Sequence, residues 1–441
     1  MKRMTRNEML KKHLRKRKVV RTIIVILLFL VLILSSIIYF YNSYHMKQIR
    51  EIEKARLEEK NKETIELIST NYSSTVQTSN DTIIYSLVNG EYIKAGSIKK
   101  GVSLNLGEVD IDENTYFFPI TNFQNTYYVA YPDVMVSNNN IETTKKRYEN
   151  YIPFDKNVVT KVTKLYKDNE LIYDLPESMS LPIYIIEADK YYVEYNNDLY
   201  YILKDDNINS VIDKKNSDEE KAKEVGTILY HFVYDPSTQK CNEIICQTIS
   251  QVQSHIDYLK SKNYFTLTMK EFEMFIDGKI NVPKNSILIT LDDGMYADNA
   301  KKLFTDNKMN ISFFIVSSWF EPMSFVTDYV EVHSHTNNLH KTGVCPNTPQ
   351  GGPLTCMDKA KLLEDLKISR ERTNMTTVIS YPFYEYNNYA ISVLKEAGFT
   401  MGFAGNNAGG SLKAHVGYDK FRIPRITILN DTSVADIAKI F

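Results

Sequence analysis

Hydrophobic and polar positions along the chain follow four different patterns in succession. Residues 23–40 form an almost unbroken apolar run, and a charged stretch with loosely spaced Ile and Leu residues follows it. Between residues 81 and 210, short apolar segments are separated by Asn-Gly, Asp-Asn and Asn-Asn turns. From residue 226 onward, short apolar runs alternate with segments of helical periodicity. These patterns predict an apolar helix, a charged stalk helix, a β-rich module and an α/β domain.

The apolar run is long enough to cross a bilayer, because about eighteen uncharged residues suffice as a helix. Positions 1–21 contain ten lysine and arginine residues and one glutamate. This excess of positive charge predicts a cytoplasmic N-terminus. A cleavable signal peptide is the alternative, but its apolar region is usually shorter and is followed by small residues. Here the run ends in Tyr-Phe-Tyr-Asn. We expect a single-pass anchor in the cell membrane, with the rest of the chain extracellular.

The predicted boundaries follow the changes in pattern: 1–21 basic cytoplasmic tail, 22–41 transmembrane anchor, 42–80 stalk helix and linker, 81–210 β-rich module, 211–225 linker and 226–441 catalytic domain. Within the β-rich module, residues 86–91 and 165–170 begin similar series of strands, so two tandem repeats that resemble bacterial SH3-like modules are expected. Its many tyrosines fit ordinary strand positions or a glycan-stacking surface. The net charge of −1 favours no polyanion, and we expect no nucleic-acid partner.

The last part of the chain predicts a parallel sheet covered by helices. The expected helices cover residues 250–262, 297–307, 358–372 and 389–398. Seven expected strands alternate with them, at residues 228–233, 287–291, 311–316, 330–333, 378–381, 401–404 and 421–428. This alternation is typical of a closed or nearly closed (β/α) barrel. In such barrels the reactive groups collect where the strands end.

Polar clusters follow two of the expected strands. Asp292 and Asp293 come after the second strand, and His335 and His340 come after the fourth. Two carboxylates and two imidazoles can supply the ligands of a divalent metal and leave one carboxylate as a base. An Asp-Asp-Gly string alone is more often a turn, but three of the eight histidines fall between residues 333 and 340.

These strings resemble the motifs of the NodB-homology polysaccharide deacetylases, over roughly residues 226–441. Thr-Leu-Asp-Asp-Gly at 290–294 is similar to the first motif of that family. Ser-His-Thr-Asn-Asn-Leu-His at 334–340 is similar to the second, particularly in the branch that acts on biofilm polysaccharides. Ser-Tyr-Pro-Phe at 380–383, with Glu-Tyr-Asn at 385–387, resembles the third.

The resemblance implies that Asp293, His335 and His340 bind the metal and that Asp292 is the catalytic base. Zinc fits such a site, and cobalt, manganese and iron also fit it. The metal would lower the pKa of a bound water and polarise the acetamide. The resemblance further implies that the backbone N–H of Phe383 stabilises the oxyanion. It assigns the remaining positions of the third motif to the substrate groove: Tyr381, Pro382 and Tyr384.

Several positions depart from the family pattern. Tyr384 stands where the third motif usually has Gly, and no Arg precedes Tyr381 to support the base. The late Leu-x-x-His that supplies a general acid is absent, and His415 is the only histidine after His340. A lone loop histidine is more often solvated than catalytic. His231, in the first expected strand, is an equally open candidate for a position at the rim of the site. His333 fits a core position better than a metal-ligand position.

Four cysteines fall as two close pairs, Cys241 with Cys246 and Cys345 with Cys356. Export from the cytoplasm favours two disulfides, and neither pair has the two-residue spacing typical of zinc knuckles. The second pair would close a loop directly after His340, which is either a connector or an element that shapes substrate entry.

We therefore expect a metal-dependent N-deacetylase of amino sugars, with cell-wall glycan or exopolysaccharide as its partner. One alternative is a catalytically silent glycan-binding protein, because the late histidine is missing. Another is an O-acetyl esterase, because the same chemistry attacks esters.

Overall fold

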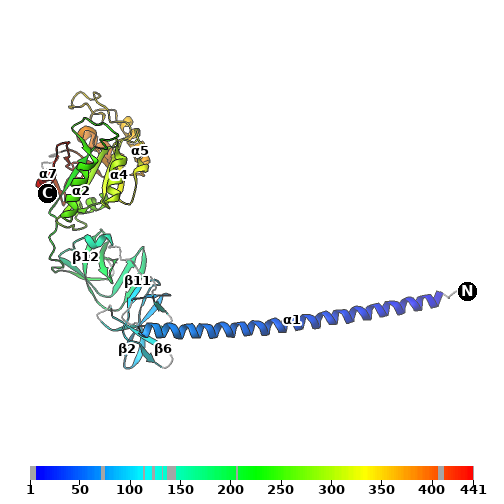
Figure 1. Ribbon diagram of the computed structural model, residues 1–441. Helices are drawn as coiled ribbons and strands as arrows, with labels where there is room; N and C mark the ends of the chain where they lie inside the picture. The colour runs from blue at the N-terminus through cyan, green and yellow to red at the C-terminus, as the bar shows by residue number, and fades with distance from the viewer. Residues whose placement is uncertain are drawn as a thin grey trace. The chain divides into compact units, whose positions relative to one another are not determined.

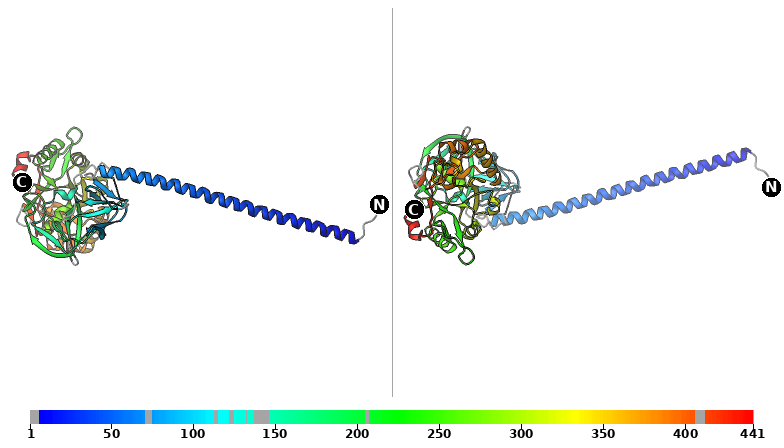
Figure 2. Two further views of the ribbon diagram at one scale, coloured as in Figure 1. Left: turned by 90° about the horizontal axis from the view of Figure 1, so that it is seen from below. Right: turned by 90° about the horizontal axis from the view of Figure 1, so that it is seen from above.

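The computed structural model describes residues 6–70, 75–112, 115–121, 125–131, 133–136, 146–204, 207–405 and 412–440. The chain divides into two compact units, residues 1–139 and residues 140–441. The first unit contains one long helix and an antiparallel β region, and the second contains another antiparallel β region and the α/β domain. Figures 1 and 2 show these elements coloured by residue number.

Helix α1 (Arg6–Thr70) contains both the predicted membrane span and the predicted stalk. Its 65 residues correspond to about 100 Å at 1.5 Å per residue, and Figure 1 shows it without a break. The apolar side chains between Ile23 and Ile38 are exposed. Among the described residues, α1 is the one helix that is long and apolar enough to cross a bilayer, a test that a signal sequence also meets.

The β region of the first unit pairs its strands in the orders β4-β1-β8 and β3-β2-β7-β6-β5. The strands are β1 (Thr75–Thr78), β2 (Thr82–Val88), β3 (Glu91–Ile98), β4 (Ser103–Asn105), β5 (Asp110–Asp112), β6 (Thr115–Ile120), β7 (Tyr127–Ala130) and β8 (Val134–Val136). Asn89 and Gly90 join β2 to β3 with positive φ angles of 53° and 86°. Two consecutive left-handed residues are typical of a tight hairpin turn, which is why the Asn-Gly pair occurs there.

The β region of the second unit has the order β15-β9-β12-β13-β14-β10-β11. Its strands are β9 (Lys156–Thr160), β10 (Thr163–Lys167), β11 (Glu170–Leu175), β12 (Ser180–Ile186), β13 (Lys190–Tyr195), β14 (Asp198–Leu203) and β15 (Ile208–Asp213). Asp168 and Asn169 join β10 to β11 with φ angles of 50° and 65°. The sequence similarity between residues 86–91 and 165–170 therefore corresponds to two β-hairpins with the same kind of turn.

The α/β domain is a parallel half-barrel. Its central strands follow the order β24-β23-β22-β21-β20-β16, and each neighbouring pair is parallel. These strands are β16 (Glu224–Tyr230), β20 (Ser286–Asp293), β21 (Ile311–Ile315), β22 (Val330–Ser334), β23 (Val378–Ser380) and β24 (Met401–Phe403). All eight residues of β20 are buried, as expected for a parallel strand covered on both faces.

Helices cover the half-barrel, and Figure 1 shows α2, α4 and α5 among them. They are α2 (Ile249–Ser261), α3 (Met269–Ile276), α4 (Ala297–Asp306), α5 (Lys359–Arg372), α6 (Asn388–Glu396) and α7 (Val434–Ile440). The predicted helix at 358–372 corresponds to α5, whose N-cap Asp358 accepts hydrogen bonds from the N–H groups of residues 360 and 361. Such a cap satisfies backbone donors that have no partner within the helix.

Residues 423–427 connect the two edges of the parallel sheet. Ile423 forms a parallel bridge with Phe403 at the β24 edge, and its carbonyl accepts a 2.8 Å hydrogen bond from the N–H of residue 404. At the other edge, β26 (Ile426–Thr427) pairs in parallel with β16. Arg425 lies between these two attachments and is completely buried. Of the strand predicted at 421–428, only β26 is regular, because this segment changes its pairing partner halfway.

Candidate metal centre

Three strands of the half-barrel end in turns that carry the predicted motifs. β20 ends with Asp292 and Asp293, His335 follows β22, and the third motif follows β23. Each turn contains a residue with a left-handed backbone: φ is 75° at Asp293, 67° at Thr336, and 60° and 61° at the consecutive residues Phe383 and Tyr384. This conformation is unfavourable for residues with a Cβ atom and often occurs at functional sites. The turns gather at the carboxyl edge of the parallel sheet, where ligand sites of such sheets lie.

Asp293, His335 and His340 form a cluster that fits a divalent metal ion. One ligand atom from each residue lies within 4.8 Å of the other two. The Nε2 atoms of both imidazoles lie 3.2 Å from the same carboxylate oxygen, Oδ1 of Asp293. That oxygen is buried, and among the described residues no donor reaches it with hydrogen-bond geometry. A buried oxygen without a hydrogen bond, facing two nitrogen donors, is the arrangement expected of metal ligands.

Hydrogen bonds outside the cluster orient the ligands. Nδ1 of His335 lies 3.0 Å from the carbonyl oxygen of Ser380. This contact assigns the ring proton to Nδ1 and leaves the electron pair of Nε2 for a metal. The loop between the two histidines is held by Asp365, whose carboxylate accepts 2.8 Å hydrogen bonds from the N–H groups of residues 337 and 338.

Asp292 is buried beside the cluster and is held by Arg425 and Ser380. The guanidinium of Arg425 donates from Nη1 to Oδ1 at 2.7 Å and from Nη2 to Oδ2 at 2.8 Å. The Ser380 hydroxyl donates to Oδ2 at 2.8 Å. Arg425 is itself fixed, because its Nε donates to the carbonyl of Ala404 at 3.0 Å. A bidentate pair of this kind combines strength with a defined orientation of the carboxylate.

Electrostatics keep both carboxylates ionised. Burial raises the pKa of Asp292, but the charges of Arg425 and His335 lower it by more, so its pKa lies below the ordinary value. Burial also raises the pKa of Asp293, but the imidazoles of His335 and His340 beside its carboxylate bring it well below the ordinary value. The site is therefore anionic around Asp293 at neutral pH, which favours a cation.

His231 lies next to this site. Its neighbour Tyr230 pairs in parallel register with Leu291, so His231 is level with Asp292. It is buried, and its Nδ1 has no hydrogen-bond partner among the described residues. Burial lowers the pKa of His231, and the charges of Asp293 and Asp292 oppose this shift only in part.

The other two histidines that the sequence singled out lie elsewhere. β25 (Lys413–His415) pairs His415 with Glu224, the first residue of β16. Tyr230 is six residues further along β16, so His415 is about 20 Å from the level of the site at 3.3 Å per residue. His415 is exposed, and the structure does not bring it to the cluster. The ring of His333 packs against the ring of Phe314. Its Nδ1 lies 2.8 Å from the hydroxyl oxygen of Thr376.

Side chains of the third motif pack against the neighbouring segments of the domain. Tyr381 and Pro382 are buried, and the Tyr381 hydroxyl donates to the carbonyl of Phe421 at 2.8 Å. Tyr384 is partly buried, and its hydroxyl lies 2.9 Å from Oγ1 of Thr427. The ring of Tyr384 fills the space in front of Gly405, where an added Cβ atom would lie 2.8 Å from it. The bulky side chain of Tyr384 therefore fits here because Gly405, which faces it, has no side chain.

Both cysteine pairs form disulfides, Cys241 with Cys246 and Cys345 with Cys356. No cysteine of the chain remains free. The second disulfide closes part of the segment that follows His340, as its spacing predicted.

Arg425 and Ser380 are the site residues that sequence reasoning missed. The family pattern directs attention to the residue before Tyr381, where this chain has Ser380, and Arg425 lies far away in sequence. One signal was available, because a basic residue inside an apolar strand-like segment is rarely buried without a partner. The Arg-Ile-Pro-Arg-Ile string at 422–426 has this form.

Metal binding can be measured by the fluorescence of Trp319, the single tryptophan of the chain. Its ring centroid lies 5.1 Å from that of His340. Titrating the metal-free protein with Co²⁺ is expected to quench Trp319 fluorescence until one ion per chain is bound. Asp293→Asn should abolish the saturable phase, and Asp306→Asn, an exposed change on α4, should retain it. Equal quenching in wild type and Asp293→Asn would contradict the assigned ligands.

Comparisons with known proteins find similarity over part of the chain. Residues 279–402 match the family model described as polysaccharide deacetylase. The chain is 25% identical over 225 residues to the poly-beta-1,6-N-acetyl-D-glucosamine N-deacetylase of Staphylococcus aureus, covering 46% of this chain and 74% of that protein. It is 24% identical over 196 residues to the polysaccharide deacetylase candidate YxkH of Bacillus subtilis, covering 42% of this chain and 65% of that protein, just under two thirds.

A solved structure of a de-N-acetylase from Aggregatibacter actinomycetemcomitans is 20% identical, with a TM-score of 0.42, and covers 49% of this chain and 100% of its own. The family match includes Asp292, Asp293 and both histidines of the cluster. The domain that contains residues 279–402 belongs to the polysaccharide deacetylase family.

Proposed function

We propose that this protein removes N-acetyl groups from amino sugars of an exopolysaccharide or of peptidoglycan outside the cell. The observation that carries the proposal is the buried carboxylate of Asp292, held ionised by Arg425 next to the cluster of Asp293, His335 and His340. The similarity to the Staphylococcus aureus enzyme, which is named for poly-β-1,6-linked N-acetylglucosamine, supports this substrate class.

A divalent metal held by Asp293, His335 and His340 would polarise the acetamide carbonyl and make a water molecule more acidic. Asp292 takes the proton of the attacking water as general base. Arg425 and Ser380 occupy some of the lone pairs of its carboxylate and orient those that remain. The backbone N–H of Phe383 donates to the carbonyl oxygen as negative charge develops there.

His231 is our candidate for the residue that protonates the leaving amine, by receiving the proton that Asp292 takes from the attacking water and passing it to the nitrogen. It is level with Asp292, it is buried, and its Nδ1 has no partner among the described residues. An imidazole without a partner can exchange a proton with the substrate without first breaking a hydrogen bond. We therefore assign to His231 the role for which the sequence left both His415 and His231 as candidates. His231→Gln is expected to lower kcat by about 10²- to 10⁴-fold, with unchanged Co²⁺ quenching of Trp319, whereas His415→Gln should leave both unchanged. Equal kcat values in the two variants would contradict this assignment.

Helix α1 would hold the protein in the cell membrane, with the basic end in the cytoplasm and the α/β domain outside. The two disulfides support an oxidising location.

Acetate release by the purified protein tests the function. We expect acetate from poly-β-1,6-N-acetylglucosamine oligomers or from peptidoglycan, and loss of acetyl groups in the corresponding polymer of expressing cells by mass spectrometry. Release only from O-acetylated, de-N-acetylated glycan would establish the esterase alternative. Binding of glycan without any acetate release from the metal-loaded protein would establish the silent glycan-binding alternative.

A further inference from the structure

The segment of residues 341–357, which we call the disulfide loop, folds back on itself directly after His340. The N–H of Gly343 donates to the carbonyl of Gln350 at 2.8 Å, and the N–H of Cys345 donates to that of Gly351 at 2.9 Å. Gly351 has a φ of 72°, and a Cβ atom there would lie 2.7 Å from the backbone nitrogen of Gly343. The Cys345–Cys356 disulfide closes the same fold. The loop is therefore a defined structure and not merely a connector.

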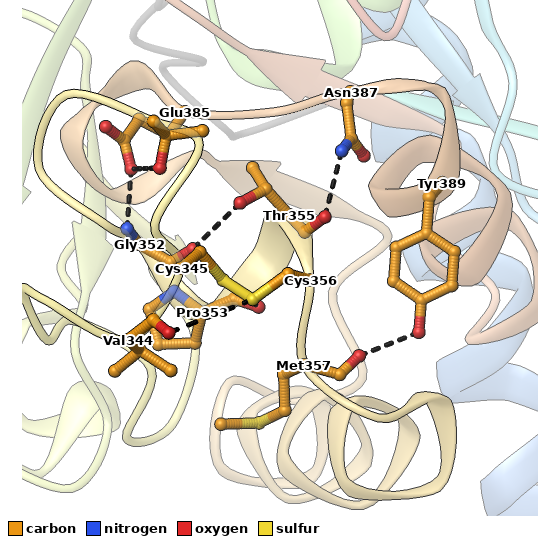
Figure 3. The surroundings of a disulfide bond; sticks show 11 residues. Val344, Cys345, Gly352, Pro353, Thr355, Cys356, Met357, Glu385, Asn387 and Tyr389 are labelled. Atoms are coloured by element: carbon orange, nitrogen blue, oxygen red, sulfur yellow. Dashed lines mark hydrogen bonds between the residues drawn. A yellow bond between two sulfur atoms is a disulfide. The ribbon is translucent and has the colours of Figure 1, made fainter.

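Glu385 reaches into this loop from the third motif (Figure 3). Its side chain is 93% buried, given a relative exposure of 7%. One carboxylate oxygen accepts a 2.6 Å hydrogen bond from the N–H of Gln350. The other accepts from the N–H of Gly352 at 2.6 Å and from Oγ1 of Thr348 at 2.9 Å. Among the described residues no lysine or arginine forms an ion pair with it, so loop donors satisfy this buried group.

The same contacts reach the turn beside the metal ligands. Glu385 directly follows Phe383 and Tyr384, which have φ angles of 60° and 61°. Two consecutive left-handed residues with aromatic side chains persist only where their surroundings hold them. An added Cβ atom on Gly352 would lie 2.7 Å from Oε2 of Glu385 and 3.4 Å from Cδ2 of Phe383, so the loop packs on both. The ring centroid of Phe383 lies 4.3 Å from that of His340.

The loop and the third motif are joined at two more points. Asn387 donates from Nδ2 to the carbonyl of Thr355 at 2.9 Å, and the hydroxyl of Tyr389 donates to the carbonyl of Met357 at 2.7 Å. Figure 3 shows these bonds on the far side of the disulfide from Glu385. Neither point lies next to the strained residues, so the loop meets the turn through the hydrogen bonds of Glu385 and through the packing of Gly352 on Phe383.

We propose that Glu385 is a positioning residue, which uses the disulfide loop as a fixed support to hold the backbone of Phe383 and the ring of His340 in their reactive arrangement. The proposal rests on the deacetylase function proposed above. Its chemical basis is that a carboxylate can accept from several N–H groups at once, whereas a neutral amide presents an N–H₂ group to some of these donors. Glu385→Gln has nearly the same shape and should already release the turn.

The test compares Glu385→Gln and Glu385→Ala with Glu396→Gln, an exposed glutamate on α6 that pairs with Lys359. In the full-length, metal-loaded protein, both Glu385 variants are expected to lower kcat by about ten- to a hundredfold, because small displacements of reacting groups have effects of this size. KM should stay within about twofold, since substrate contacts away from the turn remain. Hydrogen exchange at the N–H groups of Gln350 and Gly352 should become faster. Glu396→Gln should behave as wild type.

Faster exchange with an unchanged kcat would overturn the proposal, because Glu385 would then stabilise the loop alone. A kcat that falls only in proportion to the folded fraction, measured by circular dichroism, would overturn it as well. If wild-type protein releases no acetate, the proposed function fails, and Co²⁺ quenching of Trp319 still decides the positioning role. A changed quenching curve in Glu385→Gln supports that role, and an unchanged curve overturns it.

Discussion

Asp292→Asn is expected to lower kcat for acetate release by about 10²- to 10⁴-fold, the usual contribution of a general base. The amide of Asn cannot take a proton from water at neutral pH, while Asp293, His335 and His340 remain available as ligands. We therefore expect unchanged Co²⁺ quenching of Trp319 and a KM near that of wild type. Steady-state acetate release from the metal-loaded protein measures the effect.

The surface variant Asp306→Asn is the matched control for this substitution, since Asp306 is exposed and pairs only with Lys302 among the described residues. Because Asp292→Asn leaves the charge of Arg425 buried without a counter-charge, kcat has to be compared at a temperature at which both proteins are folded. Folded, metal-loaded Asp292→Asn with the wild-type kcat would remove Asp292 from the mechanism.

Arg425→Met is expected to destabilise the protein by about 3–5 kcal/mol, the usual effect of removing one partner of a buried ion pair. It also removes the donors that orient Asp292, so kcat of the remaining folded protein should fall. Urea unfolding of the metal-free protein, followed by Trp319 fluorescence, measures the change in the free energy of unfolding. Arg422→Met is the control, because it is the same change three residues away, on a side chain that is only partly buried.

The same variant should reverse the pH dependence that Asp292 contributes. In wild type the pKa of Asp292 is lower in the folded state, so its stabilisation is present above the unfolded pKa and is lost as the pH falls. Without Arg425, burial raises the folded pKa above the unfolded value of about 3.9. The stability of Arg425→Met relative to wild type should therefore decrease as the pH rises from about 4 toward neutrality. A constant difference would show that Asp292 and Arg425 do not interact in solution.

Contiguous strings made the metal cluster predictable. Asp292 and Asp293 are adjacent, and the two histidines lie five positions apart, so one apolar strand before each string was enough to place them at the same edge. Arg425 could not be found in this way, because its role depends on residues 423–427 joining two sheet edges. A local pattern contains no information about which distant carboxylate a buried arginine meets.

In the fold, too, features set by local sequence were predictable and features set by distant contacts were not. The long apolar run, the hairpin turns at 89–90 and 168–169 and the parallel strands were predictable from local chemistry. Helix α3 was missed, since its eight residues are too few to establish a period. The predicted strand at 421–428 is mostly irregular, because tertiary pairing at both of its ends determines its path. Glu385 looked like part of a motif, and only the folded loop shows what its carboxylate contacts.

The distance in sequence between Asp292 and Arg425, 133 residues, also has a consequence for biosynthesis. At ribosomal rates of about 5–20 residues per second, Asp292 is made roughly 7–27 s before its partner. Throughout that interval the carboxylate has no buried cation and the parallel sheet lacks the segment that joins its edges. A nascent chain can thus bring Asp293, His335 and His340 together before the carboxylate of Asp292 is oriented, and that orientation is complete only when the segment around Arg425 docks.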